Sequence, residues 1–120
     1  MNRKTLVLGA SLNSYRYSNM AILRLRQKKI SVVAIGLREG KVGDVPIFTG
    51  QPSLADIHTV TLYLNPRRQT DFYSYILALK PQRVIFNPGT ENEEFIQLLE
   101  NQGIRAEIAC TLVMLSVGNY

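Results

Sequence analysis

The sequence predicts a doubly wound α/β fold, in which helices cover both faces of a parallel sheet. Short apolar runs alternate with segments whose apolar residues recur every three or four positions, patterns typical of buried strands and amphipathic helices. Strand–helix–strand units with right-handed crossovers place helices on both sheet faces. We therefore expect five strands in the order 3-2-1-4-5, in three αβα layers, forming one domain over residues 1–120.

The first expected strand, residues 5–9, is short and apolar throughout, as strands covered on both faces are. The other four expected strands cover residues 31–36, 59–64, 83–87 and 105–110. Residues 37–57 hold three of the eight glycines and two of the five prolines, so we expect turns there rather than regular structure. We assign no definite structure to residues 111–120.

Three helices connect these strands. The first covers residues 18–29, and Ser18 is a suitable N-cap. The second begins after Asn65, where Pro66 occupies a first-turn position in which its missing N–H costs nothing. The third begins with the capping-box pattern of residues 90–93 and ends before the next glycine.

Positive charge is concentrated in the first third of the chain. Residues 1–41 hold nine Lys or Arg and one acidic residue, a net charge of +8, whereas residues 42–120 hold five basic and eight acidic residues, a net charge of −3. A local positive field beside a loop favours an anionic ligand. The pI of about 9.6 also admits nucleic acid. However, Phe72 and Tyr75, the aromatic residues nearest to a basic pair, belong to an expected core stripe.

The composition is that of an ordinary globular protein. No apolar run approaches the roughly 18 residues that a membrane helix needs. The apolar run near the N-terminus has six residues, which is too short for the core of a signal peptide. Cys110 is the only cysteine, which excludes an internal disulfide and a thiolate zinc site. We expect a cytoplasmic protein without a metal site.

The segment LVLGASLNSYRYSNMAI, residues 6–22, predicts a site for a phosphate-bearing ligand. Its glycine, Gly9, follows the first strand directly, so the backbone can approach a ligand closely, and the following helix start offers unpaired N–H groups. Neutral donors surround this loop at Ser11, Asn13, Tyr17, Ser18 and Asn19. This chemistry suits a pyrophosphate. The loop matches neither G-x-G-x-x-G nor the P-loop pattern, so a plain strand–helix connection remains the alternative.

The end of the second strand favours a phosphorylated ribose. Dinucleotide folds that bind NAD carry Asp or Glu at this place, on the ribose hydroxyls. This chain reads AIGLREGK instead, with Gly36 at the strand end and Arg38 and Lys41 nearby. Basic residues here suit NADP or coenzyme A (CoA). A solvated loop explains Arg38 equally well.

Four segments together resemble a known family. They are GASLNSYRYSN, GDVPIFTGQPSLADI, TVTLYLNP and VIFNPGTENEEF. Their order and spacing resemble those of the small stand-alone CoA-binding domain proteins, whose Rossmann-like module is shared with the succinyl-CoA synthetase alpha chain. Two positions depart from the family pattern. The usual aromatic-x-Gln-x-Gly segment reads Phe86-Asn87-Pro88-Gly89, and Lys29 stands where a helix-ending glycine is common.

This resemblance implies a CoA site at the carboxyl ends of the strands. The diphosphate would lie at the first loop and helix start, formed by Gly9, Ala10, Ser11, Asn13, Tyr17, Ser18 and Asn19. The ribose phosphate and adenine would lie near Gly36 and Arg38. The turn of Leu64, Asn65 and Pro66 would flank the adenine or the pantetheine arm, and Asn87, Pro88 and Gly89 would line the route of the arm across the strand ends.

No catalytic constellation is evident in the sequence. His58, the sole histidine, precedes the third strand at its amino end, and a lone histidine rarely acts as a base. Cys110 follows the fifth strand; we expect a small buried side chain, with a reactive thiol or a mixed disulfide with CoA as the alternative. Glu91, Glu93 and Glu94 are expected in the first turn of a helix because of its dipole.

Three classes of function remain open. The first is a module that binds CoA or an acyl-CoA without a reaction of its own, as a sensor, a carrier or a regulator with a protein partner or a second copy of the chain. The second is an NADP-type nucleotide-dependent enzyme, for which we find no candidate proton donor. The third is a nucleic-acid-binding protein, which the pI alone suggests. We favour the first.

Overall fold

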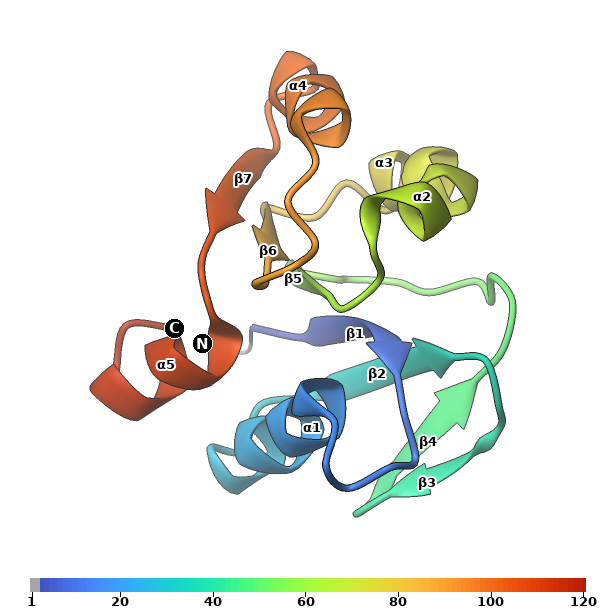
Figure 1. The fold of residues 1–120 in the computed structure, drawn as a ribbon, viewed down its shortest axis with the longest axis vertical. Coiled ribbons are helices and arrows are strands. Elements are labelled where there is room, and N and C mark those ends of the chain that lie inside the picture. Colours follow the sequence, from blue (N-terminus) through green and yellow to red (C-terminus); the bar gives the residue numbers. More distant parts are fainter. Residues whose placement is uncertain (1–2) are drawn as a thin grey trace.

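The computed structural model describes residues 3–120 and contains a seven-stranded, mostly parallel sheet (Figure 1). The strands are β1 (Thr5–Ala10), β2 (Val32–Gly36), β3 (Gly40–Val42), β4 (Val45–Phe48), β5 (Thr59–Leu62), β6 (Arg83–Phe86) and β7 (Arg105–Ile108). The helices are α1 (Tyr17–Gln27), α2 (Pro66–Gln69), the 3-10 helix η1 (Thr70–Phe72), α3 (Tyr73–Leu79), α4 (Glu93–Asn101) and α5 (Thr111–Val117). The predicted Rossmann-like α/β class is confirmed. Residues 1 and 2 of the proposed single domain lie outside the described residues.

The strand count and order differ from the prediction. The order is β3-β4-β2-β1-β5-β6-β7, so five strands in the order 3-2-1-4-5 is wrong. β5, the third expected strand, pairs with β1 rather than with β2, and Thr5 lies opposite Thr59. The place beside β2 belongs to β4, whose Ile47 lies opposite Ala34. The five expected strands therefore follow the order 2-1-3-4-5.

The two additional strands form a hairpin within the segment in which turns were expected. β3 and β4 are antiparallel, and Val42 pairs with Val45. Gly43 between them has a φ of +59°, the left-handed conformation that two-residue hairpin loops require. In β4, Val45 and Ile47 are buried while Pro46 is exposed, which is the alternation of a half-buried strand. The density of glycine and proline concealed this alternation in the sequence.

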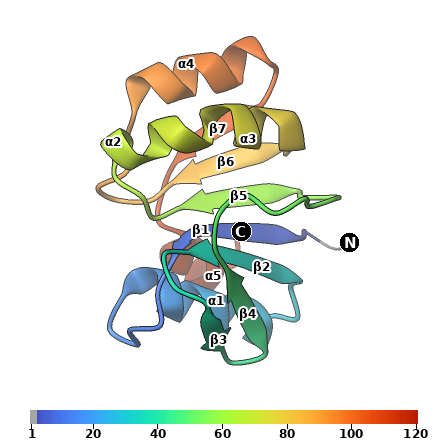
Figure 2. The same ribbon diagram turned by 90° about the vertical axis from the view of Figure 1, so that its right-hand side faces the viewer.

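The sheet separates two hydrophobic cores. α1 and α5 pack on one face, and α2, α3 and α4 lie on the other (Figure 2). Successive side chains of a strand point to opposite faces, and β1 follows this rule. Leu6 and Leu8 belong to the core that includes residues of α3 and α4, whereas Val7 packs with Ile22 and Leu25 of α1. The predicted three-layer arrangement is therefore confirmed.

Two of the predicted helix starts are displaced. α1 has Arg16 as its N-cap, and Ser18 is buried inside the first turn instead of capping it. α4 is capped by Asn92 rather than begun at Thr90: Asn92 Oδ1 accepts a hydrogen bond from the Phe95 amide at 3.1 Å.

α5 lies in the segment to which no structure was assigned. None of the helices between residues 3 and 120 has the length and apolar character needed to cross a bilayer.

Candidate functional site

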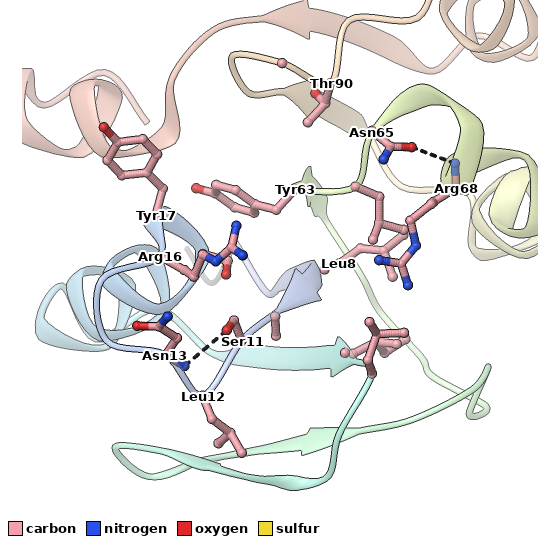
Figure 3. A pocket seen from close by; sticks show the side chains of 18 of the residues that line it. Leu8, Ser11, Leu12, Asn13, Arg16, Tyr17, Tyr63, Asn65, Arg68 and Thr90 are labelled. Carbon is pink, nitrogen blue, oxygen red and sulfur yellow. Dashed lines mark hydrogen bonds between the residues drawn. The ribbon is translucent and has the colours of Figure 1, made fainter.

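A cavity of about 700 Å³ opens at the carboxyl ends of β1, β2 and β5 and beside the loop after β6 (Figure 3). The chain order reverses at this place, because β1 is flanked by β2 on one side and by β5 on the other. Doubly wound sheets bind ligands at such points, where the loops after neighbouring strands diverge. The volume is typical of small-molecule and cofactor sites.

Most of the residues predicted from the sequence line this cavity. They are Gly9, Ala10, Ser11, Asn13, Tyr17, Ser18, Gly36, Arg38, Leu64, Asn65, Pro88 and Gly89. Three predicted residues lie outside the lining: Asn19, Pro66 and Asn87. The unpredicted lining residues include Leu8, Arg16, Ile35, Tyr63, Arg68, Phe72 and Thr90. The contact of any of these residues with a ligand stays a prediction.

The loop between β1 and α1 is held in shape by its own polar side chains. Ser11 Oγ accepts a hydrogen bond from the Asn13 amide at 3.1 Å, and Asn13 Oδ1 accepts one from the Tyr15 amide at 2.9 Å. From α1, Asn19 Nδ2 donates to the Ser11 carbonyl at 2.9 Å. These polar groups stabilise the loop, and the amides of Asn13 and Tyr15 are therefore already occupied.

The N-terminal end of α1 opens on the cavity. Its N-cap residue, Arg16, makes no capping hydrogen bond through its side chain, and the first turn holds no acidic residue. The amides of Tyr17 and Ser18 have no acceptor within the helix, because the first amides of any helix lack one. Both residues line the cavity. Unpaired N–H groups at the positive end of a helix favour an anion at this place.

Two glycines bring the ends of neighbouring strands together beneath the cavity. Gly9 has a φ of +98°, and a Cβ at this position would lie 2.9 Å from the carbonyl carbon of Tyr63, which follows β5. A Cβ at Gly36 would collide with the carbonyl oxygen of Ala10. From the sequence, Gly9 is expected to let a ligand approach the backbone. The structure shows a second requirement for glycine here, because the Tyr63 backbone lies too close for a side chain.

Three arginines line the cavity from different segments. Arg16 precedes α1, Arg38 follows β2, and Arg68 lies in α2. All three side chains are exposed, and within residues 3–120 none of them forms an ion pair. The lining contributed by the described residues includes no acidic side chain. This uncompensated positive charge favours an anionic ligand.

The wall formed by α2 is anchored by a buried amide. Asn65 is the N-cap of α2, as predicted, and its Oδ1 accepts a hydrogen bond from the Arg68 amide at 3.0 Å. Gln69 is fully buried, and its Nε2 donates to the carbonyl oxygens of Leu64 and Thr90 at 2.8 Å each. Gln69 therefore ties α2 to the loop after β6 and fixes the distance between two walls of the cavity.

Sequence reasoning missed Tyr63, Arg16 and Arg68. The first two could have been found from their positions, since Tyr63 directly precedes the predicted turn and Arg16 lies within the predicted loop. Arg68 required knowledge of which way the first turn of α2 faces. Burial raises the pKa of Tyr63 to about 12. Its phenol is therefore neutral at physiological pH.

Asn87 has a structural position beneath the cavity. It is 2% exposed, and its Nδ2 donates to Thr61 Oγ1 at 2.7 Å and to the Leu62 carbonyl at 2.8 Å. Its Oδ1 accepts a hydrogen bond from the Thr111 amide at 2.9 Å. The side chain therefore joins the end of β6 to β5 and to the start of α5.

The two side chains considered for chemistry also lie outside the cavity lining. Cys110 is half-buried at the N-cap of α5. His58 precedes β5 at the amino-terminal edge of the sheet, and its Nδ1 lies 2.7 Å from Thr59 Oγ1. Across residues 3–120, no group of three or more His, Cys, Asp or Glu side chains is arranged to hold a metal ion.

A family model described as CoA binding domain matches residues 3–116. The chain belongs to the CoA binding domain family. The family resemblance stated from the sequence is thereby confirmed. Among proteins with curated descriptions, none matches the chain.

Solved structures share this CoA binding domain fold. The crystal structure of an uncharacterised protein has 46% sequence identity and a TM-score of 0.96, and the match covers 100% of this chain and 99% of the other. A Thermus thermophilus protein has 19% identity and a TM-score of 0.87, with 99% and 91% covered. A conserved hypothetical protein from Pyrococcus furiosus has 21% identity and a TM-score of 0.80, with 92% and 97% covered. The latter two show likeness of fold alone.

Proposed function

We propose that this protein binds CoA, or an acyl-CoA, in the cavity described above, as a binding or regulatory module without a reaction of its own. The observation that carries the proposal is the open N-terminal end of α1 in a cavity that three unpaired arginines line. CoA is a long anion with a diphosphate at its middle and a phosphorylated ribose at one end. An acid-free, positively charged cavity in a member of the CoA binding domain family suits such a ligand.

The diphosphate would lie at the start of α1. The amide N–H groups of Tyr17 and Ser18 have no acceptor within the helix, so they can donate hydrogen bonds to a phosphate at this end. The positively charged Arg16 guanidinium can donate a hydrogen bond to a diphosphate oxygen. The hydrogen-bonded loop of Ser11 and Asn13 would then act as a preformed rim beside the ligand.

The two ends of CoA would leave the diphosphate in opposite directions. The adenine and its ribose would lie near Gly36 and Arg38 at the end of β2, where the exposed side chain of Leu37 offers an apolar contact to a base. The turn of Leu64, Asn65 and Pro66 would flank the adenine or the pantetheine arm, and the arm would pass the turn of Pro88 and Gly89. Asn87 would support the second turn from below through its buried hydrogen bonds.

We also propose a cytoplasmic location.

Thermal unfolding with added nucleotides tests this proposal. A ligand at 100 times its dissociation constant adds about 2.7 kcal/mol to the free energy of unfolding. CoA and acyl-CoA should stabilise the protein, and NAD should not. Arg16→Gln should weaken CoA binding, while Arg24→Gln, at an exposed position of α1 outside the cavity lining, serves as the matched control. Absence of any shift with CoA and acyl-CoA would contradict the proposal.

An NADP-dependent activity is the second candidate, because an arginine after β2 also suits a 2′-phosphate. Stabilisation by NADP but not by CoA would favour it. Mass spectrometry of the purified protein under native conditions adds an independent readout, since a retained ligand is identified by its mass. Binding to nucleic acid is tested by gel shift at two salt concentrations, because phosphate-driven binding falls steeply with salt.

A further inference from the structure

Arg68 has a fixed backbone and a free guanidinium. Its amide is held by Asn65 Oδ1 at 3.0 Å, and the next residue, Gln69, is buried with hydrogen bonds to two carbonyl oxygens. No hydrogen bond or ion pair within residues 3–120 uses the Arg68 guanidinium. Figure 3 shows its side chain extending from α2 toward the cavity, while Arg16 approaches from the other side of β1. The backbone of Arg68 is therefore held in place, while its guanidinium is free to bind an anion.

The neighbouring arginine provides a contrast. Arg67 lies in the same turn of α2, is also exposed, and is absent from the cavity lining. Successive helical residues point about 100° apart, so the two side chains leave α2 in different directions. The cavity therefore receives the side chain of Arg68 but not that of Arg67.

The charges of CoA indicate which group of the ligand Arg68 would bind. The diphosphate carries two negative charges, and a phosphate monoester such as the 3′-phosphate carries about −1.5 to −2 at pH 7. The start of α1 and Arg16 already face the diphosphate position proposed above. The two remaining cationic side chains of the lining are Arg38 and Arg68, which come from opposite sides of β1. A near-dianion is held best when two guanidinium groups donate to it.

We propose that Arg68 and Arg38 together hold the 3′-phosphate of CoA, and that Arg68 thereby makes the site selective for 3′-phosphorylated ligands. This inference rests on the proposed function and goes beyond it by adding Arg68 as a second residue on the ribose phosphate expected near Arg38, and as the one that makes the site selective. It assigns Arg68 a role in specificity, whereas the diphosphate and the arm contribute affinity that CoA shares with dephospho-CoA.

Isothermal titration with CoA and dephospho-CoA tests the proposal. We expect Arg68→Gln to weaken CoA binding about tenfold or more, as loss of a charge-assisted hydrogen bond does, and to change dephospho-CoA binding less than about twofold. Arg68→Lys should retain part of the selectivity. Arg67→Gln, the matched control, should leave both affinities unchanged. Arg38→Gln should resemble Arg68→Gln, and the double variant should show coupling, because both side chains contact one phosphate.

Two results are distinguishable. If wild-type protein binds neither nucleotide, the proposed function fails and this inference fails with it. If wild-type protein binds CoA but Arg68→Gln weakens CoA and dephospho-CoA equally, or leaves both unchanged, CoA binding stands and the assignment of the 3′-phosphate to Arg68 is overturned. Thermal unfolding of each variant without ligand verifies that α2 is still folded.

Discussion

The guanidinium carbon of Arg83 lies 4.4 Å from the centre of the Tyr120 ring. Arg83 is only 2% exposed; its Nε donates to Thr59 Oγ1 at 2.9 Å, and the nearest carboxylate oxygen, on Glu107, is 3.8 Å away. The Tyr120 hydroxyl lies 2.5 Å from Thr5 Oγ1. An aromatic face therefore covers a buried cation at the amino-terminal edge of the sheet, opposite the cavity, and compensates for the distance of the carboxylate.

Tyr120→Ala should lower the free energy of unfolding by about 2 kcal/mol, because the cation loses its aromatic cover and the packed ring is removed. Urea unfolding measures the change. Val117→Ala, at an exposed position in α5, is the control and should change stability by less than about 0.5 kcal/mol. Equal stability of the two variants would show that Tyr120 does not contribute to the fold. CoA affinity should be unaffected by either change.

Stability should decrease as the pH falls below about 6.5, because of His58. Burial is the largest cause that lowers its pKa from the ordinary value of 6.5, followed by the charges of Arg83, Arg3 and Arg105. The unfolded chain therefore binds the proton more readily than the folded one, so protonation favours unfolding between pH 6.5 and the lower pKa of the folded state. Above pH 7 the effect vanishes.

Urea unfolding at pH 7.5 and pH 5.5 measures this dependence. His58→Gln should reduce the loss of stability between the two pH values, since glutamine does not titrate. The same loss in the variant as in the wild-type protein would assign the pH dependence to other groups.

Two glycines of the cavity should differ in their response to alanine. Both have positive φ, +98° at Gly9 and +92° at Gly89, but a Cβ at Gly89 meets nothing within 4 Å whereas one at Gly9 meets the Tyr63 backbone. Gly89→Ala should therefore cost about 1 kcal/mol, for the conformation alone. Gly9→Ala should cost about 3 kcal/mol, because strain and a backbone clash add. Thermal or urea unfolding of both variants gives the comparison, and a smaller loss for Gly9→Ala would contradict it.

Asn87→Ala should destabilise the protein by about 2–3 kcal/mol, since it removes three buried hydrogen bonds, those to Thr61 Oγ1, the Leu62 carbonyl and the Thr111 amide. Asn87→Asp should also destabilise, because a carboxylate accepts hydrogen bonds where the native amide donates two. At a temperature at which Asn87→Ala is folded, we expect nearly wild-type affinity for CoA. A large loss of affinity with normal stability would instead indicate direct contact with the ligand.

Much of the fold could be predicted from local patterns. The five expected strands and the Asn65 cap of α2 follow from apolar runs and side-chain capping. The hairpin of β3 and β4 was missed because its buried residues, Val45 and Ile47, alternate with Pro46 over only four positions. Strand order is a property of long-range pairing, and a short buried strand such as β5 carries no sign of which neighbour it will join.

The candidate site was predictable where it depends on chain order and less so where it depends on side-chain direction. Residues at the ends of parallel strands converge, so twelve predicted residues line the cavity. Asn19 and Asn87 are polar and follow the same logic, yet each turns to a backbone carbonyl that the sequence does not reveal. Arg68 was missed for the converse reason, since only the orientation of α2 distinguishes it from Arg67.

The hydrogen bonds that Ser11, Asn13 and Asn19 make within the first loop have a kinetic consequence. A loop that is ordered in advance has little entropy left to lose when a ligand arrives. Association should then occur in one phase without a slow rearrangement, at a rate that falls as ionic strength rises. Differences in affinity between ligands should then arise mainly from their dissociation rates.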